Sequence, residues 1–244
     1  MHPWYEEAFG ALYPIVYHHR NDAEAIAVGD RLLSIQPVAS LRLLDLACGA
    51  GRVSRILKDL GADVTGLDLS PQLLEQAGRS APRLSLVRGD MRFLPFQPKH
   101  WDGVLSIFTS FGYFENESQD LGVLDEVRRI LKPAGFFMLD LGNPAWVRRS
   151  LVPMSERRVG AWTIRETRHL EEEGWRVVKE VWLRHSDTSR EERWTERVRL
   201  YPRDRMEKEF RIRGFAVEQV WGNYDGSPPD DDAPRLFFFC RAAD

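Results

Sequence analysis

The chain has 244 residues, 43% of them hydrophobic and 11% aromatic, enough to bury a large core in one α/β domain with a smaller elaboration. Its 34 Lys and Arg are balanced by 37 Asp and Glu, which argues against an overall basic field of the kind that binds nucleic acid or membranes. The start lacks a basic region followed by an apolar one, and no eighteen uncharged apolar residues run together, so a soluble, cytoplasmic protein is expected. Cys48 and Cys240 lack metal-ligand spacing and are expected to be reduced thiols, with no metal site.

Strand and helix patterns alternate between residues 41 and 142, after an N-terminal helical segment over 1–40 that is expected to act as a lid. Apolar runs predict five buried strands, at 41–47, 62–70, 84–90, 101–108 and 136–142. Helical patterns lie between them at 51–61, 71–81 and 117–131, and Ser70 is a candidate cap for the second helix. Strands joined by helices predict a doubly wound α/β fold, whose ligands bind at the carboxyl ends of parallel strands.

The pattern changes after residue 142. Period-two alternation over about 157–200, with turn signals at "EEEG" and "SDTS", predicts an antiparallel meander. A helical pattern at 203–214 and strand runs at 215–222 and 235–242 follow it. We therefore expect an α/β core formed by 41–142 and 201–244, with a small β insertion over 143–200 between its two parts.

A turn of small residues follows the first strand, in "LLDLACGAGR" at 43–52. Such turns often bind phosphate, because their amides can receive an anion. Here Asp45 would place a negative charge beside that phosphate, and Ser54 stands where a dinucleotide fingerprint has its third glycine. A ligand that joins adenosine to a cationic amino-acid group fits better, because Asp45 would then attract it.

Two more acids end the next two strands. Asp68 comes about twenty residues after the turn, where a two-oxygen acceptor would suit the hydroxyls of a ribose. Asp90 ends the third strand and could accept from the adenine amino group. Three carboxylates at successive strand ends point to S-adenosylmethionine. Simpler interpretations remain open: Asp45 as a charge at a helix N-terminus, Asp68 as a cap, and Asp90 as a turn residue.

Together these motifs resemble a known family. The stretches at 43–52, 64–70, 87–96, 101–114 and 131–142 are similar, in order and spacing, to successive motifs of the class I S-adenosylmethionine-dependent methyltransferases. The resemblance implies a Rossmann-like, mostly parallel sheet of seven strands with the last one antiparallel, and S-adenosyl-L-methionine as the cofactor. Ala47 stands where the family commonly has a glycine. The implied cofactor-binding residues are Asp45, Ala47, Gly49 and Gly51 at the methionine moiety, Asp68 at the ribose, and Asp90 and Met91 at the adenine, together with Leu69 and Ser106.

The N-terminal stretch "LYPIVYHHRNDAEA", at 12–25, resembles the tyrosine-containing entry helix of small-molecule N- and O-methyltransferases. Tyr13, Tyr17 and Arg20 hold matching places, so the resemblance implies that Tyr17 and Arg20 contact the cofactor and that Tyr13 contacts the substrate. Asp22 departs from the pattern, because relatives often carry another tyrosine there.

The predicted reaction requires little covalent help, because a sulfonium methyl group is already activated and catalysis is mainly alignment. A catalytic residue is therefore unknown. The candidates are Tyr113, which is equally well explained as a core residue, and His18 and His19, whose imidazoles titrate near neutral pH. The acceptor is expected above the ends of the fourth and fifth strands. The predicted substrate-binding residues are Tyr13, Thr109, Tyr113, Asn143 and Tyr224.

The resemblance also bears on the acceptor. Enzymes that methylate a nucleobase nitrogen commonly have Asn-Pro-Pro-Tyr after the fourth strand, where this chain reads "IFTSFGYF", so nucleic acid is not favoured. The meander resembles an addition found in enzymes for small metabolites such as amino sugars, where it covers the substrate or forms a homodimer. The predicted function is methyl transfer to a nitrogen or oxygen of a small molecule. A larger acceptor such as tRNA or protein, and a non-catalytic cofactor-binding protein, are the alternatives.

Overall fold

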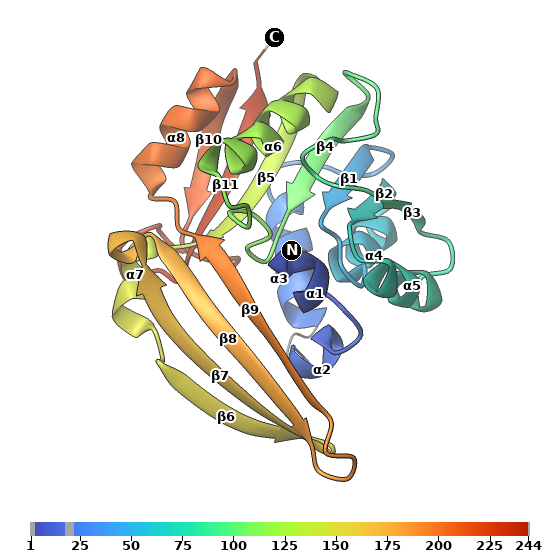
Figure 1. Ribbon diagram of the computed structural model, residues 1–244. Helices are drawn as coiled ribbons and strands as arrows, with labels where there is room; N and C mark the ends of the chain where they lie inside the picture. Colours follow the sequence, from blue (N-terminus) through green and yellow to red (C-terminus); the bar gives the residue numbers. More distant parts are fainter. Residues whose placement is uncertain (1–2, 18–21, 244) are drawn as a thin grey trace.

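The computed structural model describes residues 3–17 and 22–243 and contains two sheets (Figure 1). The larger sheet has seven strands in the order β10-β11-β5-β4-β1-β2-β3. β11 runs opposite to the other six strands of this sheet, which confirms the predicted mostly parallel α/β sheet. The strands are β1 (Arg42–Leu46), β2 (Asp63–Asp68), β3 (Ser85–Arg88), β4 (Trp101–Ser106), β5 (Leu131–Gly142), β10 (Phe215–Trp221) and β11 (Arg235–Ala242).

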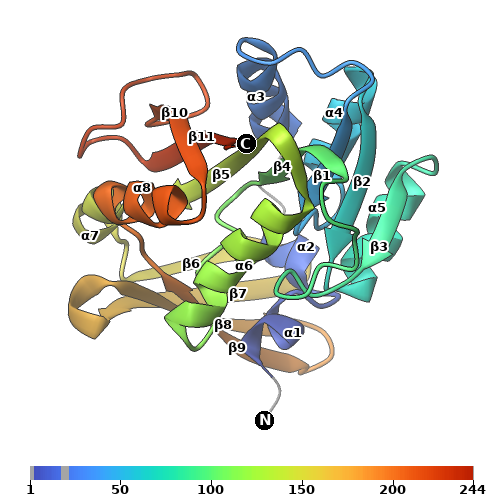
Figure 2. The same ribbon diagram turned by 90° about the horizontal axis from the view of Figure 1, so that it is seen from above.

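Helices cover both faces of this sheet (Figure 2). On one face α3 (Asp22–Leu33) and α4 (Arg52–Asp59) pack on β1, β4 and β11, and on the other α6 (Glu117–Ile130) and α8 (Arg203–Ile212) pack on β4, β5 and β11. Near β2 and β3 lies α5 (Pro71–Ser80), where the Ser70 side chain accepts from the N–H of Leu73 as its sequence position predicts. The fifth strand was expected at 136, but β5 begins at Leu131, because Leu131 already pairs with Trp101.

The second sheet is the antiparallel insertion, in the order β6-β7-β8-β9. It follows α7 (Pro144–Ser150), and its strands β7 and β8 are joined by the short 3-10 helix η1 (Glu172–Gly174). It lies across the carboxyl ends of the core strands (Figure 1). The strands are β6 (Met154–Val159), β7 (Trp162–Glu171), β8 (Arg176–His185) and β9 (Glu191–Arg199).

The N-terminal helices α1 (Trp4–Ala8) and α2 (Tyr13–Val16) lie between the two sheets (Figure 1). Ala8 and Val16 are buried against Ile164, Val181 and Leu183 on the face of the second sheet that looks toward the core. The N-terminal segment is thus packed between core and insertion. Across 3–17 and 22–243, we find no helix of the length and apolarity needed to span a bilayer.

Candidate active site

The turn after β1 requires unusual backbone conformations. Ala47 has φ of 60°, Gly49 of 55° and Gly51 of 76°, all in the left-handed region that glycine adopts most easily. The glycine that the family resemblance implies at position 47 would adopt this conformation more easily than Ala47 does. Gly51 has a further reason to be glycine, because an added Cβ would lie 3.1 Å from the Cβ of Ala77 in α5.

Asp45, at the end of β1, is almost completely buried. It is 2% exposed, and the Ser54 hydroxyl donates to its Oδ2 over 2.5 Å. Burial raises the pKa of Asp45 to about 6, although hydrogen bonds from Ser54 pull in the opposite direction. The carboxyl group is therefore in an environment where a nearby cation would favour its ionised form.

Asp68, at the end of β2, holds the turn in place. Its Oδ2 accepts from the Gly49 N–H and its Oδ1 from the Ser70 N–H, each over 2.8 Å. Burial raises the pKa of Asp68, and these amide hydrogen bonds lower it in part. Each oxygen keeps a lone pair for a further donor.

Asp90, just after β3, is bound by a neighbouring arginine. The Arg92 guanidinium donates to both oxygens, over 3.1 Å from Nε and 2.6 Å from Nη2. Burial raises the pKa of Asp90, but the hydrogen bonds and charge of Arg92 outweigh that effect and lower it. A ligand amino group at Asp90 would have to share the carboxylate with Arg92.

Ala47, Gly49, Asp68 and Asp90 line a first cavity. Its walls combine aromatic side chains of the N-terminal segment with the loops that follow β1, β2, β3 and β4. The lining residues are Tyr5, Phe9, Tyr13, Ala47, Gly49, Leu67, Asp68, Leu69, Gly89, Asp90, Met91, Ser110, Tyr113 and Phe114.

A second cavity continues the first along the turn after β1. The two share Tyr13, Ala47, Gly49 and Ser110, so they form two lobes of one site. The second lobe adds Asp45 and Cys48 from the turn, Pro14 and Tyr17 from the N-terminal segment, and Arg52, Gln76 and Phe108. One end of the combined site therefore offers Asp68 and Asp90, and the other offers Asp45.

A third cavity separates the core from the second sheet. It shares Tyr13 and Tyr17 with the second lobe, and Tyr13 and Tyr113 with the first. Its floor includes Thr109, and its roof comes from β8 and β9. The lining charged side chains are Glu24, Arg168, Lys179, Glu196 and Arg235.

The floor of the third cavity is a strained turn after β4. Phe108 and Thr109 have φ of 62° and 61°, although neither is glycine. The Phe108 N–H donates to Oδ2 of Asp140 over 2.7 Å, and that buried carboxylate also pairs with Arg235 over 2.9 Å. Asp140 thus fixes the backbone that presents Thr109.

Several predicted site residues do not line these cavities. Tyr224 is buried and its hydroxyl donates to Asp140 over 2.6 Å, so it supports the site from behind and does not reach the acceptor side. The Asn143 amide donates to the carbonyls of Asp230 and Ala233 and accepts from the Ala145 N–H, which ties α7 to the β10–β11 loop. Both side chains are already engaged in structural contacts.

Two of the predicted cofactor residues are also set back from the cavities. Gly51 packs against α5 and begins α4, and Ser106 is buried at the end of β4. His18, His19 and Arg20 lie outside the described residues. The other predicted cofactor residues, and Tyr13, Thr109 and Tyr113, do come together around the three cavities.

The structure adds residues that the sequence reasoning missed. Tyr5 and Phe9 cover the first cavity, and Lys179 and Glu196 line the third. Asp140 could have been noticed, because it is an acid near the end of an apolar strand, as Asp45 and Asp68 are. Lys179 and Glu196 carried a weaker signal, since they are charges at inward positions of alternating strands.

The structure has the arrangement of a class I methyltransferase. Its sheet has seven strands with one of them antiparallel, a turn of small residues follows β1, and acids stand at the ends of β1 and β2. Comparison with known proteins agrees: a family model described as a methyltransferase domain matches residues 43–135. The matched domain and the fold are those of the class I S-adenosylmethionine-dependent methyltransferases. The chain is an enzyme whose methyl donor is S-adenosylmethionine.

Individual relatives resemble the chain along nearly its whole length. A dTDP-3-amino-3,4,6-trideoxy-alpha-D-glucopyranose N,N-dimethyltransferase of Streptomyces venezuelae is 29% identical, over 91% of this chain and 96% of its own. A dTDP-3-amino-3,6-dideoxy-alpha-D-glucopyranose N,N-dimethyltransferase of Streptomyces fradiae is 27% identical, over 91% of this chain and 89% of its own. The CcbJ methyltransferase structure from Streptomyces caelestis covers 97% of this chain and 98% of its own, with a TM-score of 0.82 and 17% identity, a likeness of fold.

Proposed function

We propose that the enzyme methylates the nitrogen of a small-molecule amine bound in the third cavity. The observation that carries this proposal is the junction of the three cavities. Tyr13 borders all of them, so an acceptor in the third cavity would meet the donor site at Tyr13 and Tyr17. The second sheet covers the third cavity, which favours a small acceptor over tRNA or protein.

The two-lobed site suits S-adenosylmethionine in charge, because it has acids at both of its ends. We assign the adenosine to the first lobe, with Asp68 at the ribose and Asp90 with Met91 at the adenine, and the amino group to Asp45. The cofactor supplies an already activated methyl group when it is bound. The chain itself has to bind and orient the donor and the acceptor and to exclude water. We assign the exclusion of water to the aromatic side chains of the N-terminal segment.

Nitrogen is favoured as the acceptor atom because the two Streptomyces relatives are named as N,N-dimethyltransferases of amino sugars. The third cavity also suits an amine, because Tyr13, Tyr17 and Tyr113 give it aromatic walls. Methyl transfer to a hydroxyl is the second candidate, and Thr109 and Tyr113 would orient either kind of acceptor.

The proposal is tested in two steps with the purified protein. Calorimetric titration with S-adenosylmethionine and S-adenosylhomocysteine, after removal of carried-over ligand, measures the donor site alone. Incubation with S-adenosylmethionine and separate acceptors then measures S-adenosylhomocysteine formation and product mass, using amino sugars, their nucleotide conjugates, small alcohols, tRNA and a protein mixture. We expect turnover with an amine. Turnover with only tRNA or protein would overturn the small-molecule assignment.

A further inference from the structure

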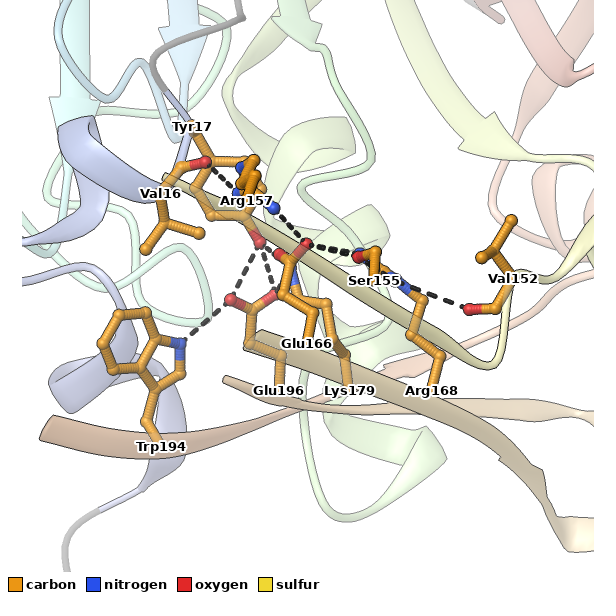
Figure 3. A network of polar contacts seen from close by, with 10 residues as sticks. All are labelled: Val16, Tyr17, Val152, Ser155, Arg157, Glu166, Arg168, Lys179, Trp194 and Glu196. Atoms are coloured by element: carbon orange, nitrogen blue, oxygen red, sulfur yellow. Dashed lines mark hydrogen bonds and ion pairs between the residues drawn. The ribbon is translucent and has the colours of Figure 1, made fainter. Parts of the chain in front are cut away.

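A polar network lies on the inward face of the second sheet, beside the third cavity (Figure 3). Arg168 of β7 is directly opposite Lys179 of β8, which is directly opposite Glu196 of β9. Glu166 of β7 is 4% exposed and Glu196 is 8% exposed. Burying ionised groups is expensive even when they are paired, so such a network is weak evidence for a role in stability alone.

The network binds the end of the N-terminal segment. The Tyr17 hydroxyl donates to Glu196, over 2.8 Å to Oε1 and 2.7 Å to Oε2, and Lys179 Nζ donates to the Tyr17 hydroxyl. Lys179 Nζ also lies 4.4 Å from the centre of the Tyr17 ring. One residue earlier, Arg157 donates to the Val16 carbonyl over 2.6 Å. Three inserted strands therefore hold the last turn of α2.

The side chains that hold Tyr17 are themselves fixed. The Trp194 indole donates to Oε1 of Glu196 over 3.0 Å, and Lys179 Nζ lies 2.8 Å from Oε2. Lys179 is also 3.7 Å from Glu166. Burial raises the pKa of Glu166, but the hydrogen bond from Arg157 and the charges of Lys179, Arg168 and Arg157 outweigh it and bring the pKa to about 2. Glu166 thus stays ionised at neutral pH.

The segment that the network holds also covers both lobes of the donor site. Tyr5, Phe9 and Tyr13 line the first lobe, and Tyr13, Pro14 and Tyr17 line the second. A ligand that fills both lobes can leave on this side only if the segment shifts. Contacts between Tyr17 and the second sheet oppose that shift.

We propose that Glu196 and Lys179 are positioning residues for the donor: acting through Tyr17, they hold the N-terminal segment over the donor site and slow the release of the bound nucleoside. The inserted sheet then serves the donor site as well as the acceptor site. This inference rests on the proposed donor site, and on no assumption about the acceptor.

S-adenosylhomocysteine is the probe, because its dissociation can be followed without a known acceptor. The rate constant is measured by surface plasmon resonance on immobilised full-length protein. Glu196→Gln, Tyr17→Phe and Lys179→Met each change one member of the polar contacts that join Tyr17 to the second sheet. Tyr17→Phe keeps the ring that lines the site. We expect each variant to release the probe at least about fivefold faster, since a hydrogen bond to a charged group is lost. Glu180→Gln is the matched control, because Glu180 is exposed and follows Lys179 in β8, so strand alternation directs it to the opposite face of the sheet.

Thermal unfolding of the ligand-free variants, measured in parallel, separates positioning from a purely structural role. A lowered melting temperature with an unchanged dissociation rate in Tyr17→Phe and Glu196→Gln would overturn the inference and leave the donor site intact. If Glu196→Gln fails to fold, Tyr17→Phe decides, since it removes a single oxygen. Failure of the unmodified protein to bind the probe would instead refute the donor site, and this inference with it.

Discussion

Asp45 is a buried acid whose ionisation opposes folding of the ligand-free protein. Its pKa is about 6 in the folded chain against about 4 when unfolded. The folded state therefore binds more protons in that window, and this contribution to stability falls as pH rises from about 4 to about 6. We expect Asp45→Asn to raise the free energy of unfolding at neutral pH by about 2 kcal/mol. Urea denaturation checks this, with exposed Asp59→Asn as the control; no gain at neutral pH would contradict it.

The same titration predicts how donor affinity depends on pH. If the cationic amino group of the donor lies beside Asp45, binding favours the ionised carboxylate and releases a proton below about pH 6. Affinity should rise with pH by up to about tenfold per unit below that pKa and level off above it. Calorimetry with S-adenosylhomocysteine across this range measures the slope. In Asp45→Asn the slope should vanish, and a flat profile in the unmodified protein would place the amino group elsewhere.

Asp68 both holds the turn after β1 and faces the first cavity, and a single substitution affects both roles. Its carboxylate accepts from Gly49 and Ser70, and it faces the first cavity. We expect Asp68→Ala to weaken S-adenosylmethionine binding by roughly 1 to 3 kcal/mol, because the ribose loses its acceptor. Asp68→Asn keeps one oxygen and should lose less. Unchanged affinity in the alanine variant, measured by calorimetry, would refute the assignment of Asp68 to the ribose.

At the scale of elements, the turn after β4 depends on a side chain from the neighbouring strand. Asp140 in β5 is 0% exposed and binds the Phe108 N–H, the Tyr224 hydroxyl and Arg235. Asp140→Asn removes the charge that compensates Arg235, so we expect a loss of about 3 kcal/mol in the free energy of unfolding. Urea denaturation measures it.

A second substitution tests that explanation. In Asp140→Asn, Arg235 keeps only the more distant carboxylate of Glu24, at 3.6 Å. Adding Arg235→Met removes this poorly compensated charge, so the double variant should recover part of the lost stability. Losses that simply add would mean that the pair is not coupled. Because Thr109 lines the third cavity and Phe108 lines both that cavity and the second lobe, the single variant should also lose methyl transfer and bind the donor more weakly.

The elements that sequence reasoning predicted well are those specified by local pattern. Asp45 and Asp68 each end a buried strand, so the topology of the parallel sheet was enough to bring them to one edge. Ser70 was predicted as a cap from its own position before Pro71. The places of Tyr224 and Asn143 were missed, because their partners Asp140, Asp230 and Ala233 are more than eighty residues away in sequence. The partners of Tyr17 on β8 and β9 depend on how two separate sheets dock, which no local pattern encodes.

At the scale of the whole molecule, the N-terminal segment connects two sheets that do not pair with each other. Its aromatic side chains face the donor lobes, Ala8 and Val16 face the insertion, and the Trp4 indole donates to the Tyr113 carbonyl of the core. A bound donor would therefore contact a segment that both sheets also contact. The same segment forms a wall of the acceptor cavity through Phe9, Tyr13 and Tyr17.

We expect the outer side of the insertion to form a contact between two copies of the chain. Exposed apolar side chains occur on α7 and the strand after it, with Trp146 36%, Val152 57% and Met154 64% exposed. Within the described chain β6 pairs only with β7, so its other edge is available. Both features favour a homodimer through this side, since exposed apolar side chains and edge strands are typical contact sites.

Light scattering after size-exclusion chromatography measures that assembly. The unmodified protein should elute at twice the mass of one chain, and Met154→Glu should elute as a monomer, because the new charge would be buried at the contact. Ile212→Glu on α8 is the matched control: Ile212 is 65% exposed but belongs to the core domain, so its substitution should leave the dimer intact. A monomer at every concentration of the unmodified protein would show that the insertion acts within one chain, and that β6 ends the sheet at a charged edge formed by Glu156, Arg157 and Arg158.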